Sequence, residues 1–239
     1  MKPVLLSWSG GKDSTLSLYE IEKRGEFEVR ALLTTLTRDF DRISMHGVRR
    51  ELLEMQAAAL DLKIDEVWIS KNAPNSEYEE QMRAVLEKRK AEGIRHVVFG
   101  DLFLEDIRRY REERLAQIGM QGVFPLWGRP TREVADFFIA EGFRAILCTV
   151  DPKALPKEFC GREFDRSLLN DLPEGVDPCG ENGEFHTFVY DGPVFRSRIE
   201  VRTGEVVRRD GFYFADIIPR SGRQGGEQRG AKVEGSYLQ

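Results

Sequence analysis

Short apolar runs alternate with amphipathic helical patterns along the first 151 residues of the chain. The runs cover residues 4–9, 29–36, 65–70, 96–102, 122–127 and 143–151, and each has the length and apolar character of a buried strand. Between the runs, apolar residues recur every three or four positions, as Val48, Leu52, Met55 and Ala59 do. Six strands separated by helices predict an α/β fold with a doubly wound parallel sheet. In such sheets ligands bind beyond the carboxyl ends of the strands.

The pattern changes after residue 151. Residues 152–178 are rich in proline and charge and are typical of a loop, with one short helix at about residues 165–172. Residues 184–218 have the pattern of two or three strands. We therefore expect a ligand-binding domain over 1–151 and a small β-rich C-terminal part over 152–220 that binds substrate. Residues 221–239 have little to bury, and we expect a disordered tail there.

The end of the first apolar run has the composition of an anion-binding loop. It is not a Walker A loop, because Asp13 follows Lys12 where that loop needs a serine or threonine. In addition, no glycine stands five positions before Gly11. Adjacent glycines let the backbone turn sharply and offer N–H groups to an anion, and the following helix directs its positive end to the same place. The alternative to an anion site is that Asp13 or Ser14 caps the helix. A junction formed only for capping would need one glycine and one capping residue, fewer than this loop contains. The loop therefore favours a phosphate site, formed by Ser9, Gly10, Gly11, Lys12, Asp13 and Ser14.

A second unusual stretch covers residues 177–195. Asn182 and Gly183 form a strong signal for a two-residue hairpin turn, which would put Glu181 and Glu184 directly opposite each other. Like charges in that position destabilise a hairpin, and strand alternation would place Glu184 and His186 on one face. The pair is either a solvent-exposed turn, where repulsion is screened, or a site that accepts a cation such as Mg²⁺, ammonium or a substrate amine.

Composition narrows the classes of protein. The 239 residues are 41% hydrophobic and carry a net charge of −5, which argues against a broad basic face for nucleic acid. No apolar run approaches the length of a membrane span, so we expect no membrane partner and a cytoplasmic location. Three cysteines without a C-x-x-C spacing suit a reducing compartment. Zinc bound by these cysteines with His186 is the less favoured alternative to buried thiols.

The hexapeptide at residues 9–14 resembles the PP-loop of the N-type ATP pyrophosphatases, which include the argininosuccinate, asparagine and GMP synthetases. The run from Gly180 to Val189, followed by Asp191, Pro193 and Phe195, resembles the diphthine–ammonia ligase family within that superfamily. The pair Gly100 and Asp101 and the sequence PLWGR at residues 125–129 are also similar, so the likeness runs from residue 1 to about 195. A Tyr-Gln-Arg run that the family carries after the fourth strand is replaced here by IRRYREER.

The resemblance implies an adenine nucleotide α-hydrolase-like fold, with ATP bound in residues 1–151 together with Mg²⁺. It implies that ATP is split between its α and β phosphates, that an acceptor carboxylate is adenylated, and that ammonia displaces AMP. The ATP site would comprise the six loop residues with Thr35 and Gly100, and Asp13 would hold the metal. Catalytic roles fall on Lys12, Asp13, Asp101, Glu181 and Glu184, and the substrate would meet His46, Arg49, Gly180, Asn182, Gly183 and His186.

Several alternatives stay open from the sequence. His46 and Arg49 stand at a helix start, where a solvated helix end is as good an explanation as a ligand contact. Arg108, Arg111 and Arg114 are spaced like an exposed face paired with glutamates, which we favour over a binding role. The acceptor is elongation factor 2 if the family role holds, and a homodimer is a candidate assembly. The rival functions are a tRNA-thiolating PP-loop enzyme and a non-catalytic adenine-nucleotide sensor, which ATP turnover to AMP and pyrophosphate would distinguish.

Overall fold

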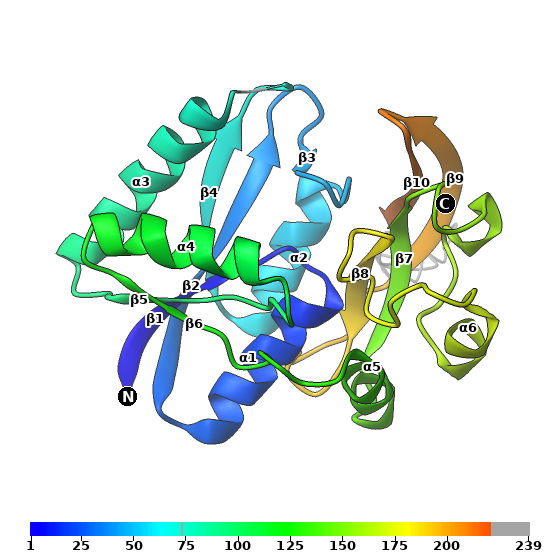
Figure 1. Ribbon diagram of the computed structural model, residues 1–239, viewed down its shortest axis with the longest axis horizontal. Coiled ribbons are helices and arrows are strands. Elements are labelled where there is room, and N and C mark those ends of the chain that lie inside the picture. The colour runs from blue at the N-terminus through cyan, green and yellow to red at the C-terminus, as the bar shows by residue number, and fades with distance from the viewer. Residues whose placement is uncertain (73, 221–239) are drawn as a thin grey trace, which may run out of the picture.

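The computed structural model describes residues 1–72 and 74–220, which form two sheets that lie side by side (Figure 1). In the first sheet, β2 (Phe27–Thr37) pairs in parallel with β1 (Lys2–Ser7) and β4 (Lys63–Ile69). On its other side β1 pairs in parallel with β5 (His96–Val98), and β5 pairs with β6 (Gln121–Val123). The predicted parallel sheet is thus confirmed. A short strand, β3 (Arg42–Ile43), adds to the end of β2 in the antiparallel sense.

Helices cover both faces of this sheet, as expected for a doubly wound fold. Helices α1 (Lys12–Arg24) and α2 (Arg50–Leu60) contribute to the core that contains Val4 and Leu6, on one face of β1. Helices α3 (Asn75–Ala91) and α4 (Glu105–Gln117) contribute to a separate core with Leu5, on the other face. Because successive side chains of a strand point to opposite faces, the uninterrupted apolar run in β1 serves both layers. The loop after β1 and the loop after β5 then meet where the connections change direction, which is where such folds bind ligands.

The second sheet is antiparallel throughout and has the order β8-β7-β10-β9. Its strands are β7 (Arg144–Val150), β8 (Phe185–Asp191), β9 (Val201–Arg209) and β10 (Phe212–Pro219). The expectation that residues 143–151 continue the parallel sheet is therefore wrong. An apolar run buried on both faces looks the same whether its neighbours run parallel or antiparallel, so the sequence could not distinguish them. The predicted boundary at residue 151 falls inside this sheet, since β7 precedes it and β8 follows it.

The remaining elements surround the second sheet. They are α5 (Thr131–Ala140), the 3-10 turn η1 (Lys157–Phe159) and α6 (Arg166–Asp171). The short helix predicted at about residues 165–172 is confirmed, and Asp165 caps it by accepting a hydrogen bond from the Leu168 amide at 2.8 Å. Three strands follow residue 184, where the pattern predicted two or three. The tail predicted over residues 221–239 lies outside the described residues.

One core connects the two sheets. Buried side chains of β1 and α1 belong to the same cluster as Phe138 of α5, Leu147 of β7 and Phe188 of β8. The other face of the first sheet is packed more sparsely, because Leu86 is the buried residue of α3 and Leu115 that of α4. In the part of the chain that the structure describes, no helix is long and apolar enough to cross a membrane.

Candidate active site

The loop between β1 and α1 forms the tight turn that its glycines predict. Gly10 has a φ of +77°, and a side chain there would lie 2.6 Å from Gln56 Oε1. A Cβ on Gly11 would approach the Thr187 carbonyl oxygen to 2.9 Å. The helix begins at Lys12 after Gly11, and no side chain caps it. Capping by Asp13 or Ser14 is therefore not the reason for this sequence, and both residues lie in the first turn, where the helix end attracts anions.

Strand β8 of the second sheet is hydrogen-bonded to this loop. The Val189 amide donates to the Gly10 carbonyl at 2.8 Å, and the Lys12 amide donates to Thr187 Oγ1 at 3.0 Å. Sequence reasoning did not identify Thr187 as part of the site. The loop is therefore shaped by residues more than 170 positions away, and the two sheets act together at this point.

Gln56 of α2 is a second residue that sequence reasoning missed. Its buried side-chain amide donates to the carbonyls of Gly10 at 3.0 Å and Val189 at 2.6 Å, and its Oε1 accepts from Trp8 Nε1 at 3.0 Å. The signal in the sequence was a glutamine next to the apolar stripe of an amphipathic helix. Such a residue is buried only if it finds partners, and here the partners lie on the loop and on β8.

Lys12 is a buried cation at the centre of the site. Its Nζ donates to both carboxylate oxygens of Asp13 at 2.8 Å and also to the Cys179 carbonyl. Burial is the largest single influence and would lower the pKa of Lys12, but the charge and hydrogen bonds of Asp13 together with the neighbouring Cys179 and Glu181 outweigh it, so the pKa is raised and the lysine stays charged. Burial raises the pKa of Asp13 while Lys12 opposes that shift. The side chain of Asp13 is still 30% exposed, so it can meet a ligand.

A cavity of about 230 Å³ lies in front of the loop and brings residues of both sheets together. The loop and the first turn of α1 form one wall, the residues after β5 form a second, and the segment before β8 forms a third. We call it the loop cavity. Of the residues predicted for the site, those that line it are Ser9, Gly11, Lys12, Asp13, Ser14, His46, Gly100, Asp101, Gly180, Glu181, Gly183 and His186.

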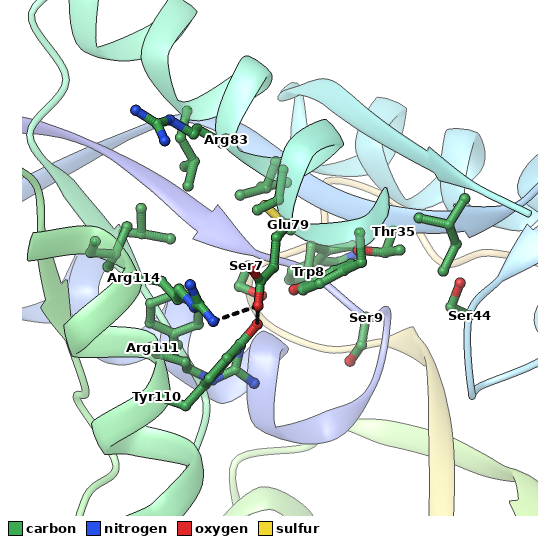
Figure 2. A pocket seen from close by; sticks show the side chains of 18 of the residues that line it. Ser7, Trp8, Ser9, Thr35, Ser44, Glu79, Arg83, Tyr110, Arg111 and Arg114 are labelled. Atoms are coloured by element: carbon green, nitrogen blue, oxygen red, sulfur yellow. Dashed lines mark hydrogen bonds and ion pairs between the residues drawn. The ribbon is translucent and has the colours of Figure 1, made fainter. Parts of the chain in front are cut away.

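A larger cavity of about 800 Å³ adjoins the loop cavity (Figure 2). It extends from Trp8 and Thr35, at the carboxyl ends of β1 and β2, to the space between α3 and α4. Thr35 was predicted for the ATP site and lines this cavity. The two cavities adjoin, because they share the lining residues Ser7, Ser9, His46, Phe99, Arg111 and His186.

The predicted hairpin at Asn182 and Gly183 is wrong. Residues 177–184 form a series of turns, and no strand precedes Glu181 to pair with β8, whose partner is β7. Glu184 Oε1 accepts from the Asp177 amide at 3.1 Å and from Asn182 Nδ2 at 3.0 Å, and neither Glu184 nor Asn182 lines either cavity. The two glutamates therefore do not share a ligand, and Glu184 shapes the segment instead.

Glu181, by contrast, faces the loop. Its Oε1 accepts from the Leu102 amide at 2.7 Å, which ties the segment before β8 to the residues after β5. Burial raises the pKa of Glu181 to about 7, helped by Asp13 and opposed by the Leu102 amide and Lys12. A carboxyl group with this pKa can take up or release a proton near neutral pH.

His46 and His186 stack on each other where the two cavities meet. Their ring centroids are 4.3 Å apart with an interplanar angle of 29°. Burial lowers the pKa of His186 to about 4, aided by Lys12, and burial together with His186 lowers the pKa of His46 well below its ordinary value. Both rings are neutral at pH 7 and present polar edges without a charge.

Arg49 was predicted to meet the substrate, but the structure does not bring it to either cavity. Its guanidinium donates to both carboxylate oxygens of Asp216 on β10, at 2.9 and 2.6 Å, and Arg42 donates to the same carboxylate at 3.0 Å. This cluster joins the segment between β3 and α2 to the second sheet. Arg49 therefore has a structural contact where the sequence suggested a ligand.

Arg108, Arg111 and Arg114 were predicted to form an exposed helix face, and for Arg111 this prediction is wrong. Arg111 lines both cavities, and its Nε lies 2.9 Å from Asp101 Oδ2. Its guanidinium carbon lies 4.5 Å from the centroid of Phe99. Arg108 does pair with Glu112 on the helix surface as predicted, at 2.9 Å, whereas Arg114 pairs with Glu79 of α3 at 2.6 Å. The predicted residue Asp101 thus comes to the site together with a cation.

The zinc alternative gains no support. Cys148, Cys160 and Cys179 are buried free thiols, and burial raises the pKa of each to about 12, which makes them unreactive. Within residues 1–72 and 74–220, no group of three or more His, Cys, Asp or Glu side chains is arranged to hold a metal ion.

Comparison with known proteins matches this chain to two family models. The model described as the diphthamide synthase N-terminal domain matches residues 1–122, and the one described as the diphthamide synthase C-terminal domain matches residues 131–217. The chain belongs to the diphthamide synthase family. The gap between the two matches falls between β6 and α5, where the chain leaves the first sheet of this family member for the second.

Curated relatives of this diphthamide synthase family member carry one name, diphthine–ammonia ligase. The protein from Bos taurus is 31% identical over 144 residues, which cover 58% of this chain and 52% of that protein. The protein from Schizosaccharomyces pombe is 26% identical over 221 residues, covering 83% of this chain and 36% of that protein. The protein from Danio rerio is 26% identical over 229 residues, covering 87% of this chain and 90% of that protein. The match thus spans about half of the first relative and a third of the second.

Proposed function

We propose that this protein is an ATP-dependent, AMP-forming carbon–nitrogen ligase that adenylates an acceptor carboxylate and transfers ammonia to it. The observation that carries the proposal is the loop cavity. It combines a glycine loop at a helix N-terminus, a buried charged lysine and a carboxyl group with a pKa near 7, Glu181, from the other sheet. Membership of a family whose curated relatives are named diphthine–ammonia ligases supports the same chemistry.

The first step joins the acceptor to AMP. An acceptor carboxylate oxygen attacks the α-phosphorus of ATP, the bond to the β-phosphate oxygen breaks, and pyrophosphate leaves. Negative charge grows on the leaving group beside the N-terminus of α1 and the Lys12 ammonium, which stabilise it more in the transition state than in the ground state. Because β8 holds the loop through Thr187 and Val189, these donors do not need to reorganise during the reaction.

The second step forms the amide. The ammonia nitrogen attacks the carbonyl carbon of the acyl-adenylate, AMP leaves with the electron pair, and one proton must be removed from nitrogen. Glu181 is suited to take up this proton, because it lines the cavity and its pKa is about 7. The neutral rings of His46 and His186 lie beside the same space and add no charge that would repel an ammonium ion at its entry.

Magnesium fits this site as an ion that arrives with the nucleotide. Mg²⁺ in nucleotide sites is usually held by one or two carboxylates together with phosphate oxygens and water, so a cage of protein ligands is not required. Asp13 would hold it, since its carboxylate is partly exposed in the loop cavity, and Asp101 is the second candidate. When bound, the ion supplies positive charge to the pyrophosphate.

The acceptor, the assembly and the cellular location are proposed from membership of the family. The names of the relatives suggest diphthine as the acceptor class, and its location on elongation factor 2, a homodimeric assembly and a cytoplasmic location are further parts of the proposal. The unpaired, unreactive thiols are in keeping with a reducing compartment. A non-catalytic nucleotide sensor would leave the raised pKa of Glu181 without a use, and a C-x-x-C pair for sulfur chemistry is absent from the sequence.

The test is Lys12→Met, which keeps the length of the side chain and removes its charge. We expect formation of AMP and pyrophosphate from Mg-ATP to fall by about a hundredfold or more, the usual scale for losing a positioned electrostatic group. Lys23→Met, in the last turn of the same helix, is the matched control and should keep the rate of the wild type. Circular dichroism would verify that both variants fold. ADP and phosphate as products of the wild type would contradict the proposal.

A further inference from the structure

The larger cavity extends between α3 and α4, which are joined by the ion pair of Glu79 with Arg114. Their apolar stripes predict packing against the sheet, yet Leu86 and Leu115 are the buried residues of these helices. Met82 is only partly buried, and Tyr110 is 38% exposed. The open space belongs to the larger cavity. We define the α3–α4 cleft as the part of that cavity lined by Glu79, Met82, Arg83, Leu86, Tyr110, Arg111, Arg114, Leu115 and Ile118.

The cleft is a second compartment beside the nucleotide end of the cavity. Figure 2 shows Glu79, Tyr110 and Arg114 meeting between the two helices, while Thr35 and Ser44 lie on the other side of Trp8. Along α4 the lining runs from Tyr110 to Ile118, a distance of about 12 Å at about 1.5 Å per residue. A nucleotide whose phosphates lie on the loop and whose base lies at Thr35 would leave this length free.

Arg111 stands where the cleft meets the loop cavity, and its position is fixed. Asp101 pairs with it at 2.9 Å, and Phe99 packs against the plane of the guanidinium at 4.5 Å. Its side chain is still 29% exposed. Lys12, the other cation of the loop cavity, already donates to Asp13 and to the Cys179 carbonyl. A planar guanidinium with donors left over is the group best shaped to bind a carboxylate.

We propose that the acceptor acid binds in the α3–α4 cleft and that Arg111 binds its carboxylate beside the α-phosphate. This inference rests on the ligase chemistry of the proposed function and names the acceptor site and its chemical class, which differs from the diphthine that the names of the relatives suggest. The cleft walls are apolar at Met82, Leu86, Leu115 and Ile118, so the class is a carboxylate at the end of an elongated, largely apolar chain. Glu79 pairs with Arg114 at 2.6 Å at the border of the cleft, and Arg83 pairs with Glu87 at 2.8 Å, so neither Arg114 nor Arg83 is an unpaired cation.

The experiment measures how carboxylic acids stimulate pyrophosphate release by the full chain in the presence of Mg-ATP and ammonium. The probes are butanoate, hexanoate, octanoate and 3-phenylpropanoate. We expect at least one of them to stimulate release several-fold. Arg111→Gln should raise the KM for that acid at least tenfold and change the KM for ATP less than threefold. Arg109→Gln is the matched control, because Arg109 is an exposed residue of the same helix that pairs with Asp106 and lines neither cavity.

Two further variants keep the test decisive if Arg111→Gln folds poorly. Arg111→Lys retains the charge next to Asp101 and should restore part of the affinity for the acid. Met82→Trp narrows the cleft and should shift the preference towards the shortest acid of the series. Both should bind a non-hydrolysable ATP analogue as the wild type does, within threefold by isothermal titration calorimetry.

The outcomes separate this inference from the proposed function. If none of the acids stimulates the reaction, or if Arg111→Gln and Arg109→Gln behave alike, the α3–α4 cleft is not the acceptor site. Tenfold weaker binding of the ATP analogue to Met82→Trp would show that the nucleotide occupies the cleft, which also overturns the inference. In each case, continued formation of AMP and pyrophosphate would leave the proposed function intact, whereas formation of ADP would refute that function itself.

Discussion

Replacing Gln56 with leucine should uncouple the nucleotide loop from the second sheet. The side chain of Gln56 is fully buried and joins three groups: the indole N–H of Trp8 and the carbonyls of Gly10 and Val189. Leucine has a similar size, so the substitution removes the hydrogen bonds and leaves little empty volume. The loop would lose the contact that links it both to the strand before it and to β8.

The expected loss in the free energy of unfolding follows from the buried polar groups that lose their hydrogen-bond partner. The Gly10 carbonyl keeps its hydrogen bond from the Val189 amide at 2.8 Å, whereas the Trp8 indole and the Val189 carbonyl lose the partner that Gln56 provided. A buried polar group without a partner costs about 1–3 kcal/mol. Two such groups predict a loss of about 2–6 kcal/mol in the free energy of unfolding. The apolar gain from leucine offsets part of this, so the lower half of that range is expected.

Equilibrium unfolding in urea measures this loss, and titration with a non-hydrolysable ATP analogue measures the effect on the site. Gln121→Leu is the matched control, because Gln121 is an exposed residue at the start of β6, and its free energy of unfolding should stay within about 0.5 kcal/mol of the wild type. We also expect weaker nucleotide binding by Gln56→Leu alone. A loss below about 1 kcal/mol, with unchanged nucleotide affinity, would refute the argument that Gln56 fastens the loop.

Two predictions concern pH. Glu181 has a pKa of about 7, so if its carboxylate takes up the proton from ammonia, kcat of the wild type should rise as pH increases through about 7, and Glu181→Gln should lose that limb in profiles measured from pH 5.5 to 9. Burial lowers the pKa of His186 from 6.5 to about 4, so the stability that its neutral ring provides is complete above pH 6.5 and is lost as pH falls towards 4. At about 1.4 kcal/mol per pH unit this amounts to at most about 3.5 kcal/mol. Urea unfolding at pH 7 and pH 4.5 should show a smaller difference for His186→Asn than for the wild type, and equal differences would contradict the assignment.

The sequence predicted the first sheet well because local signals and tertiary structure agree there. The apolar runs of β1, β2 and β4 are separated by long amphipathic helices, which requires parallel crossovers. The run that forms β7 has the same composition, but its partners β8 and β10 follow it along the chain. Nothing within a strand reveals the direction of its neighbours, so this assignment needed the structure.

The part of the site that the backbone forms could be predicted from the sequence. Gly10 and Gly11 revealed the loop because only glycine fits the positive φ of one and the close contact of the other with Thr187. The turn at Asn182 misled the prediction, because the amide of Leu102, a distant residue, determines where Glu181 points. Arg111 was missed because its spacing from Arg108 is the same in a solvated helix face, and its partner Asp101 lies in the loop that precedes α4.

The proposed function requires that this protein cleaves ATP at the α-phosphorus. Reaction of the full chain with Mg-ATP in H₂¹⁸O, without added acceptor, tests it most directly, because water then takes the place of the acceptor carboxylate. The products can be separated and their oxygen isotopes determined by mass spectrometry. We expect one ¹⁸O atom in AMP and unlabelled pyrophosphate, with both products lost in Lys12→Met. Label in pyrophosphate or in inorganic phosphate, or ADP as the nucleotide product, would contradict it.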